Sequence, residues 1–215
     1  MKKILSIILV CVLMVSTAAF AAEQSDCVAE LGKYSVIKGD PDGNMRLSDN
    51  LSRGEAVTLL VRAYGFTPET SIAAPANEFS DMENHWACNA AMIAKGLKII
   101  DGAKGDMFNP DESIKSEDFI QMIIRLLGYE ELADRRGGKP IGYLTVASQI
   151  GVTKGVSMAT GQFITREEAA SLLCNSLDIP HMAQTSFGED SVAYGLLNGE
   201  DGKELRTLRT MLEGR

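Results

Sequence analysis

The sequence predicts a mainly α-helical fold built from three copies of one helix–loop–helix unit. Three observations support this prediction: one order of segments recurs three times, apolar residues recur at helical spacing, and long alternating strand patterns are scarce. Each copy has an apolar stretch ending at a glycine, a polar loop, a helix start and an amphipathic helix. Units this small cannot bury a core alone, so we expect the copies to pack on one another.

The three copies align on their glycines and on their helix starts. The apolar stretches end at Gly39, Gly102 and Gly155, and the second helices start near Arg53, Ser116 and Arg166. The spacing from glycine to helix start is the same in the first two copies and shorter in the third. The third copy is therefore expected to have a shorter loop.

The first 21 residues are typical of a secretory signal peptide. Two lysines precede an apolar run from Ile4 to Val15, and Ala19–Ala21 offers small residues for cleavage. The run is too short for a comfortable membrane span, so we expect no span after cleavage. Residues 1–21 therefore take no part in the predicted fold.

The remaining chain divides into three repeats and a tail. We expect repeat 1 at 22–66, a linker at 67–77, repeat 2 at 78–138, repeat 3 at 139–180 and a tail at 181–215. Apolar spacing predicts helices over 27–34, 56–64, about 86–95, 119–127, 143–150, 169–177 and 205–212. The tail begins glycine-rich and acidic, carries no fourth copy, and is interpreted as a connecting or partly disordered segment.

Two of the helix starts fit a capping box. Ser52 with Glu55, and Thr165 with Glu168, have the spacing at which the hydroxyl accepts from the third helical amide and the glutamate accepts from the cap amide. This pattern predicts that these four residues support the helix ends.

The capping boxes put Arg53 and Arg166 at the first helical position, where the helix dipole is already positive. A cation there calls for a compensating anion, which is either an internal carboxylate or a bound ligand. Copy two departs from the pattern, since it has Lys115, Ser116 and Asp118 at the equivalent positions. We therefore expect any anion site of copy two to be weaker or different.

The charge balance is acidic. The chain has 21 basic and 29 acidic residues, a formal net charge of −8. A nucleic-acid partner is disfavoured, because phosphate neutralisation needs a basic face. A local site for an anionic ligand remains compatible with this composition, because a few arginines suffice to make one.

The cysteines beyond the signal peptide are Cys27, Cys88 and Cys174. No pair has the CxxC spacing; Cys88 and Cys174 lie within helical patterns and Cys27 lies near an apolar strip, so buried free thiols are the favoured interpretation. One disulfide with one free thiol is the alternative.

Metal and catalytic sites find little support. His85 and Cys88 share a helical face without further ligands nearby, and the Asp40–Asn44 segment fails the EF-hand pattern, so it is interpreted as a turn. Common catalytic motifs are absent from the sequence. We expect neither a cofactor nor a bound metal, and no enzymatic activity.

With these motifs in view, the chain resembles the S-layer homology (SLH) family. Copy two matches the first half of the family signature at Phe79–Asp81, His85–Ala87, Gly96–Leu97, Gly102 and Phe108–Pro110. Copies one and three match the second half at Leu51–Glu55 and Ile164–Glu168. The resemblance spans residues 27 to 180.

The resemblance implies a pseudo-threefold unit with a central helical bundle and three grooves. Such grooves bind secondary cell-wall polymers of Gram-positive bacteria, often acidic or pyruvylated glycans. It implies carbohydrate contacts by Arg53, Arg166, Gly39, Gly102, Gly155 and Trp86, with Ser52, Glu55, Thr165 and Glu168 supporting the helix starts. The protein is then expected at the cell wall or cell surface, as a noncovalent anchor.

Two alternatives stay open. Trp86 can stack on a sugar, but its place beside a helix start favours a core anchor. The departures of each copy from the signature also allow a structural protein of the cell surface whose repeats bind another protein.

Overall fold

The computed structural model describes residues 26–40, 42–69, 76–101, 106–185, 193–199 and 202–214. The predicted signal peptide and Gly102 lie outside these ranges. The labelled helices are α2 (Arg53–Ala63), α3 (Cys88–Gly96), α4 (Ser116–Leu126), α5 (Glu130–Arg135), α6 (Ile141–Ile150), α7 (Arg166–Ser176) and α8 (Leu208–Glu213). Residues 26–33 are also helical. The prediction of a mainly helical fold is confirmed.

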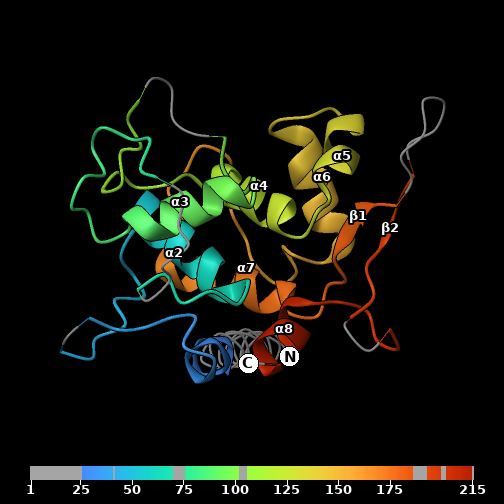
Figure 1. The fold of residues 1–215 in the computed structure, drawn as a ribbon, viewed down its shortest axis with the longest axis horizontal. Helices are drawn as coiled ribbons and strands as arrows, with labels where there is room; N and C mark the ends of the chain where they lie inside the picture. The colour runs from blue at the N-terminus through green and yellow to red at the C-terminus, as the bar shows by residue number, and fades with distance from the viewer. Residues whose placement is uncertain are drawn as a thin grey trace, which may run out of the picture.

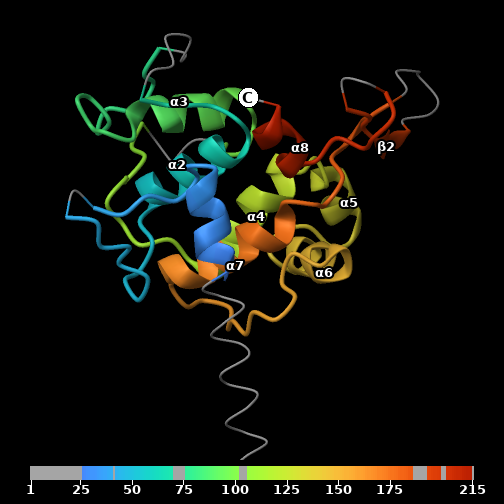
Figure 2. The ribbon, with the colours of Figure 1, turned by 90° about the horizontal axis from the view of Figure 1, so that it is seen from below.

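The helices pack as one body around α4 (Figure 1). Helix α2 packs on α3 and α4, α4 packs on α6 and α7, and α5 packs on α6. Figure 2 shows α7 and the first helix on one side, with α6 at the edge. The buried apolar residues of all these elements form one continuous core.

Three apolar residues, one ahead of each helix start, form a closed ring of main-chain hydrogen bonds. The Leu51 amide donates to the Ile164 carbonyl (2.8 Å), the Ile114 amide to the Leu51 carbonyl (2.9 Å), and the Ile164 amide to the Ile114 carbonyl (3.1 Å). All three side chains are buried. Each copy is therefore bonded to both others at the centre of the fold.

Helix α5 is missing from the sequence prediction, which has a polar loop there. Its N-cap residue, Tyr129, makes no side-chain capping bond, so the start signal on which such a prediction depends is absent. The helix is short and stabilised by packing on α6: Gly142 faces the Ala133 carbonyl so closely that a Cβ would clash. Tertiary contact, not local propensity, forms this element.

The C-terminal segment packs on the bundle. Strands β1 (Met182–Gln184) and β2 (Tyr194–Leu196) pair antiparallel, and Leu208 and Leu212 of α8 are buried. The predicted helix over 205–212 corresponds to α8, whereas the interpretation of the segment as connecting or partly disordered stays a prediction. The many charged residues around α8 gave no sign that Leu208 and Leu212 would be buried.

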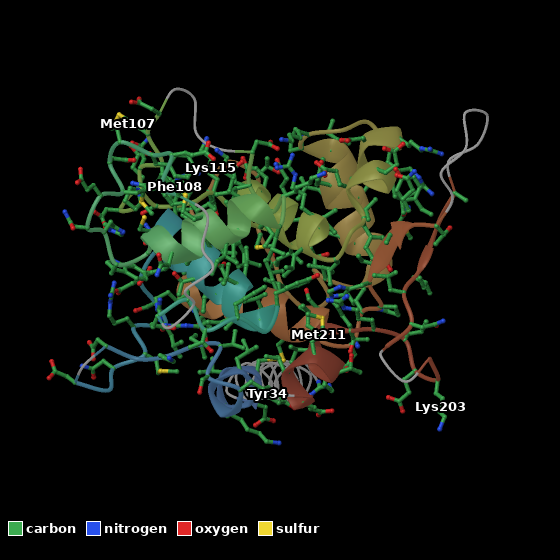
Figure 3. The ribbon with its side chains drawn as sticks, viewed as in Figure 1. Tyr34, Met107, Phe108, Lys115, Lys203 and Met211 are labelled. Carbon is green, nitrogen blue, oxygen red and sulfur yellow. A yellow bond between two sulfur atoms is a disulfide. The ribbon has the colours of Figure 1, made fainter. Side chains whose placement is uncertain are left out.

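Helix α8 lies beside the first helix. Arg209 forms ion pairs with Glu30 and with Asp178, where Nη2 lies 2.9 Å from Oδ2, and the Tyr34 hydroxyl donates to Glu213 at 2.9 Å. Figure 3 labels Tyr34, just after the first helix, and Met211 on α8. These bonds join the beginning and the end of the described chain.

A disulfide joins Cys27 to Cys174, whose Cα atoms are 5.5 Å apart, while Cys88 is free. The favoured interpretation of three free thiols is therefore wrong, and the alternative of one disulfide holds. Cys27 lies on the first helix and Cys174 on α7, so the disulfide joins two helices that are far apart in the sequence. Cysteine spacing alone could not predict this pairing.

The described residues form neither a membrane-spanning helix nor a cluster of metal ligands. None of the helices there is long and apolar enough to cross a membrane. Nor does that part of the chain bring together three or more histidine, cysteine or acidic side chains in a way that suits a metal ion.

Candidate ligand-binding groove

A cavity of about 800 Å³ lies between the loop of copy one, α2 and the His85–Ala87 turn. We call it the main groove. Its basic side chains are Lys38, Arg46, Arg62 and Arg166, its acidic ones are Asp40, Glu55 and Asp111, and its aromatic one is Trp86. Basic groups thus outnumber acidic ones here, although the whole chain is acidic.

Arg166 forms one wall of the main groove and is almost fully engaged with the protein. Its side chain is 8% exposed. Nε donates to the Met45 carbonyl (3.0 Å), Nη2 donates to the Lys38 carbonyl (3.1 Å), and Nη1 lies 3.0 Å from Glu55 Oε1. The guanidinium therefore fastens the loop of copy one to the start of α7.

Glu55 serves two purposes. Its Oε2 accepts from the Ser52 amide at 2.9 Å, while the Glu55 amide donates to Ser52 Oγ at 3.2 Å, which completes the predicted capping box. Its Oε1 faces Arg166. The predicted roles in helix capping and in orienting an arginine are both found.

The second predicted capping box is also present. The Thr165 amide donates to Glu168 Oε2 (2.8 Å), and the Glu168 amide donates to Thr165 Oγ1 (3.2 Å). Helices α2 and α7 begin at Arg53 and Arg166, as the sequence predicts.

Arg53 occupies the equivalent position but lines a different, smaller cavity of about 280 Å³. Its Nε donates to the Phe108 carbonyl at 2.9 Å, and its guanidinium lies 5.0 Å from the centre of the Phe108 ring; Figure 3 labels this phenylalanine. Asp118 lines the same cavity, at the position that Glu55 holds beside Arg166. The two arginines are thus equivalent, but they do not share one site.

Trp86 is 61% exposed and lines the main groove. The interpretation of Trp86 as a core anchor is wrong, because α3 begins later, at Cys88, and the tryptophan lies in the preceding turn. Ala87 takes the buried position. The Ala87 amide donates to His85 Nδ1 at 3.1 Å, which holds the turn and leaves the indole outside.

The glycines differ in what they do. Gly39 lines the main groove, and a Cβ there would lie 3.0 Å from the main chain of Gly43, so the loop needs glycine for its own packing. Gly155 has φ of +71° and open space around it. The backbone conformation, not lack of space, therefore favours glycine at this position. Gly155 does not line the main groove.

Sequence reasoning missed Lys38, Arg46, Arg62 and Asp111 as groove residues. Their positions carry no signature residue type, and the fold brings them together from three separate segments. The one available signal was the turn-forming Asp40–Asn44 segment, which places the basic residue Arg46 just after a rigid turn.

Residues 78–120 match the family model of the S-layer homology domain. The predicted resemblance is thereby confirmed for copy two, which held the Phe79–Asp81 and His85–Ala87 motifs.

Proteins of other bacteria are similar to this chain over most of its length. It is 26% identical over 88% of the chain to "Middle cell wall protein" of Brevibacillus brevis and, over the same share, to "Surface layer protein" of Brevibacillus choshinensis. It is 25% identical over 74% of the chain to "Cell surface protein" of Thermoanaerobacter kivui. The matches cover 19%, 18% and 20% of these relatives, so the chain spans about a fifth of their length.

In the segment 78–120, Asp81 lies two positions after Phe79 and binds main-chain amides of the loop before α4. Its two carboxylate oxygens accept from the amides of Phe108 (2.7 Å) and Asn109 (2.6 Å). Although desolvation acts against the charged form, these amide bonds hold the pKa of Asp81 below its usual value. The aspartate therefore fixes the loop that leads to α4.

Proposed function

We propose that the chain is a noncovalent cell-wall anchor whose main groove binds an acidic group of a secondary cell-wall polymer, such as a pyruvylated glycan. It is a cell-surface protein, as its S-layer homology domain and its relatives indicate. On this proposal its three copies act as one pseudo-threefold unit, and it carries no catalytic activity of its own.

The observation that carries the proposal is an exposed tryptophan beside a basic cluster in one large cavity. Trp86 offers a flat, amphipathic ring, which suits the apolar face of a sugar. Lys38 and Arg46 have side chains that are 48% and 46% exposed, so a carboxylate can reach them. A glycan with an acidic substituent satisfies both features at once.

The ring of hydrogen bonds among Leu51, Ile114 and Ile164 supports the threefold arrangement. Each equivalent cavity then lies where two copies meet. In the third, of about 260 Å³, Ser116 stands where the others have an arginine, and Ile120, Val156 and Met158 contribute apolar surface. We therefore assign anion binding to the main groove first and the Arg53 cavity second.

Co-sedimentation with cell walls tests the proposal. The protein is mixed with walls purified from a bacterium that carries pyruvylated wall polymer, and with the same walls after acid extraction of that polymer. We expect sedimentation with native walls and its loss with extracted walls. Equal sedimentation with both would favour a protein or peptidoglycan partner and contradict the proposal.

A further inference from the structure

We propose that Arg46 is the residue that contacts the anionic group in the main groove, and that Arg166 is a positioning residue that holds the Arg46 loop. This inference rests on the proposed function and assigns its ligand contact to a loop rather than to a helix start. It differs from what the family resemblance implies, which is a contact by Arg166.

The hydrogen-bond donors of Arg166 are already used by the protein. All three of its nitrogen atoms already have protein partners, two main-chain carbonyls and the Glu55 carboxylate, and its side chain is 8% exposed. A ligand anion would compete with Glu55 for a charge that is already neutralised. The two carbonyls belong to Lys38 and Met45, which flank the turn before Arg46, so the arginine clamps the base of that loop.

Arg46 also forms ion pairs, with Asp49 and more distantly with Glu55, but it is far more exposed than Arg166. Its side chain is 46% exposed, and Nε donates to Asp49 Oδ2 at 2.8 Å, which orients the guanidinium. Nη1 lies 3.7 Å from Glu55 Oε1, too far for a hydrogen bond. Among the described residues, neither terminal nitrogen of Arg46 has a hydrogen-bond partner, so the outer edge of the guanidinium is available to a carboxylate.

Hydrogen bonds within the protein hold the loop that carries Arg46. Asp40 Oδ1 accepts from the amides of Asp42 (3.0 Å) and Asn44 (2.8 Å). Arg166 holds the next carbonyl, that of Met45. A cation on such a loop loses little conformational entropy when it binds an anion.

The backbone of Arg46 gives an independent reason to assign it a function. Its φ is +52°, in the left-handed region, which arginine rarely adopts. Asn109 is its counterpart in copy two, with φ of +57°. The correspondence is structural, because each residue follows the carbonyl that accepts from an arginine Nε, at Met45 and at Phe108.

Copy two thus places asparagine where the backbone favours asparagine, and copy one places arginine there at a conformational cost. Strain of this kind persists where a side chain is needed for binding. The asparagine of copy two therefore suggests the test variant Arg46→Asn in copy one. Asparagine suits this backbone conformation, so the change removes the guanidinium without adding strain.

The single tryptophan of the chain makes the test specific to this groove. Since Trp86 is the only tryptophan and lines the main groove, its fluorescence reports binding there and not in the Arg53 cavity. The probes are a methyl glycoside carrying a 4,6-pyruvate ketal and the same glycoside without it. Four proteins are compared: wild type, Arg46→Asn, Arg46→Lys and Arg166→Lys, each with its thermal unfolding midpoint.

We expect the ketal, but not the parent glycoside, to change the fluorescence of the wild type. Arg46→Asn should weaken binding about tenfold or more, with an unfolding midpoint equal to or above that of the wild type. Arg46→Lys should bind with intermediate affinity. Arg166→Lys should lower the midpoint, and well below that midpoint it should bind the ketal more tightly than Arg46→Asn does, because the contacting guanidinium of Arg46 is still present.

Wild-type affinity in Arg46→Asn would overturn the inference, as would binding by Arg166→Lys as weak as that of Arg46→Asn at an unchanged midpoint. The proposed function fails separately, if the wild type ignores native walls. A wild type that sediments with native walls while Trp86 fluorescence ignores the ketal would keep the anchor and reject the main groove as its site.

Discussion

Arg166 and Glu55 form an ion pair, Nη1 to Oε1 at 3.0 Å, that connects the helix start of copy three to that of copy one. Both side chains are largely shielded, at 8% and 16% exposure. The pair therefore belongs to the internal structure of the repeat unit, and the open charge of the main groove lies on its neighbours.

Removing the charge of Glu55 should destabilise the fold. Glu55→Gln leaves the Arg166 guanidinium shielded and without its carboxylate, which should lower the free energy of unfolding by about 3 kcal/mol. Glu168→Gln is the matched control, because Glu168 holds the same capping position and forms no ion pair with any described residue. The control should lose about 1 kcal/mol or less. Equal losses in urea denaturation would show that the ion pair adds nothing to capping.

The disulfide should contribute to stability. Replacing Cys27 and Cys174 by serine frees the first helix from α7 and should lower the free energy of unfolding by about 2–4 kcal/mol. Cys88→Ser, at a free cysteine, should change it little. Denaturant titration of the three proteins measures this, and a double serine variant as stable as the wild type would contradict the assigned pairing.

The stability of the protein should fall between pH 6.5 and 4 through His181. Burial, and secondarily the nearby Arg206 charge, lower the pKa of this imidazole to about 4, and Nε2 is buried without a partner among the described residues. Because the folded state prefers the neutral ring, the stabilisation is complete above the unfolded pKa near 6.5 and is lost as the pH falls toward 4.

Linkage gives a loss of about 3 kcal/mol over this range. The measurement is the unfolding free energy of wild type and His181→Gln at pH 7, 5.5 and 4. The wild type should lose more than the variant, after the carboxylates common to both are allowed for. Parallel curves would contradict the assigned role of the imidazole.

Trp86 should matter for binding and not for stability. Because it is 61% exposed, Trp86→Ala should change the unfolding free energy by no more than about 0.5 kcal/mol. Loss of a stacked ring should weaken wall binding about threefold to tenfold. Phe163→Ala is the control, since Phe163 is 51% exposed and does not line the main groove. Equal effects of the two variants in co-sedimentation would argue against stacking at Trp86.

The sequence predicted what local chemistry dictates. Capping boxes at Ser52 and Thr165 located the starts of α2 and α7 to the residue, because a hydroxyl and a glutamate at that spacing bond to the main chain of their own helix end. Helix α5 escaped prediction because it depends on contact with α6 at Gly142.

The candidate site was less predictable for the same reason. Its walls come from the copy-one loop, α2, the Trp86 turn and the start of α7. The sequence left open whether Arg166 pairs with an internal carboxylate or with a ligand. The structure pairs it with Glu55, which belongs to another copy. Likewise, helical spacing placed Trp86 in the core, whereas the turn before α3 turned it outward.

A crystal structure of the protein with the pyruvylated glycoside bound tests the account most directly. The account predicts the ketal carboxylate within hydrogen-bond distance of the Arg46 terminal nitrogens, with the sugar ring over Trp86 and the Arg166–Glu55 pair intact. A carboxylate bound to Arg166 in place of Glu55, or a sugar found in the Arg53 cavity with the main groove empty, would contradict it.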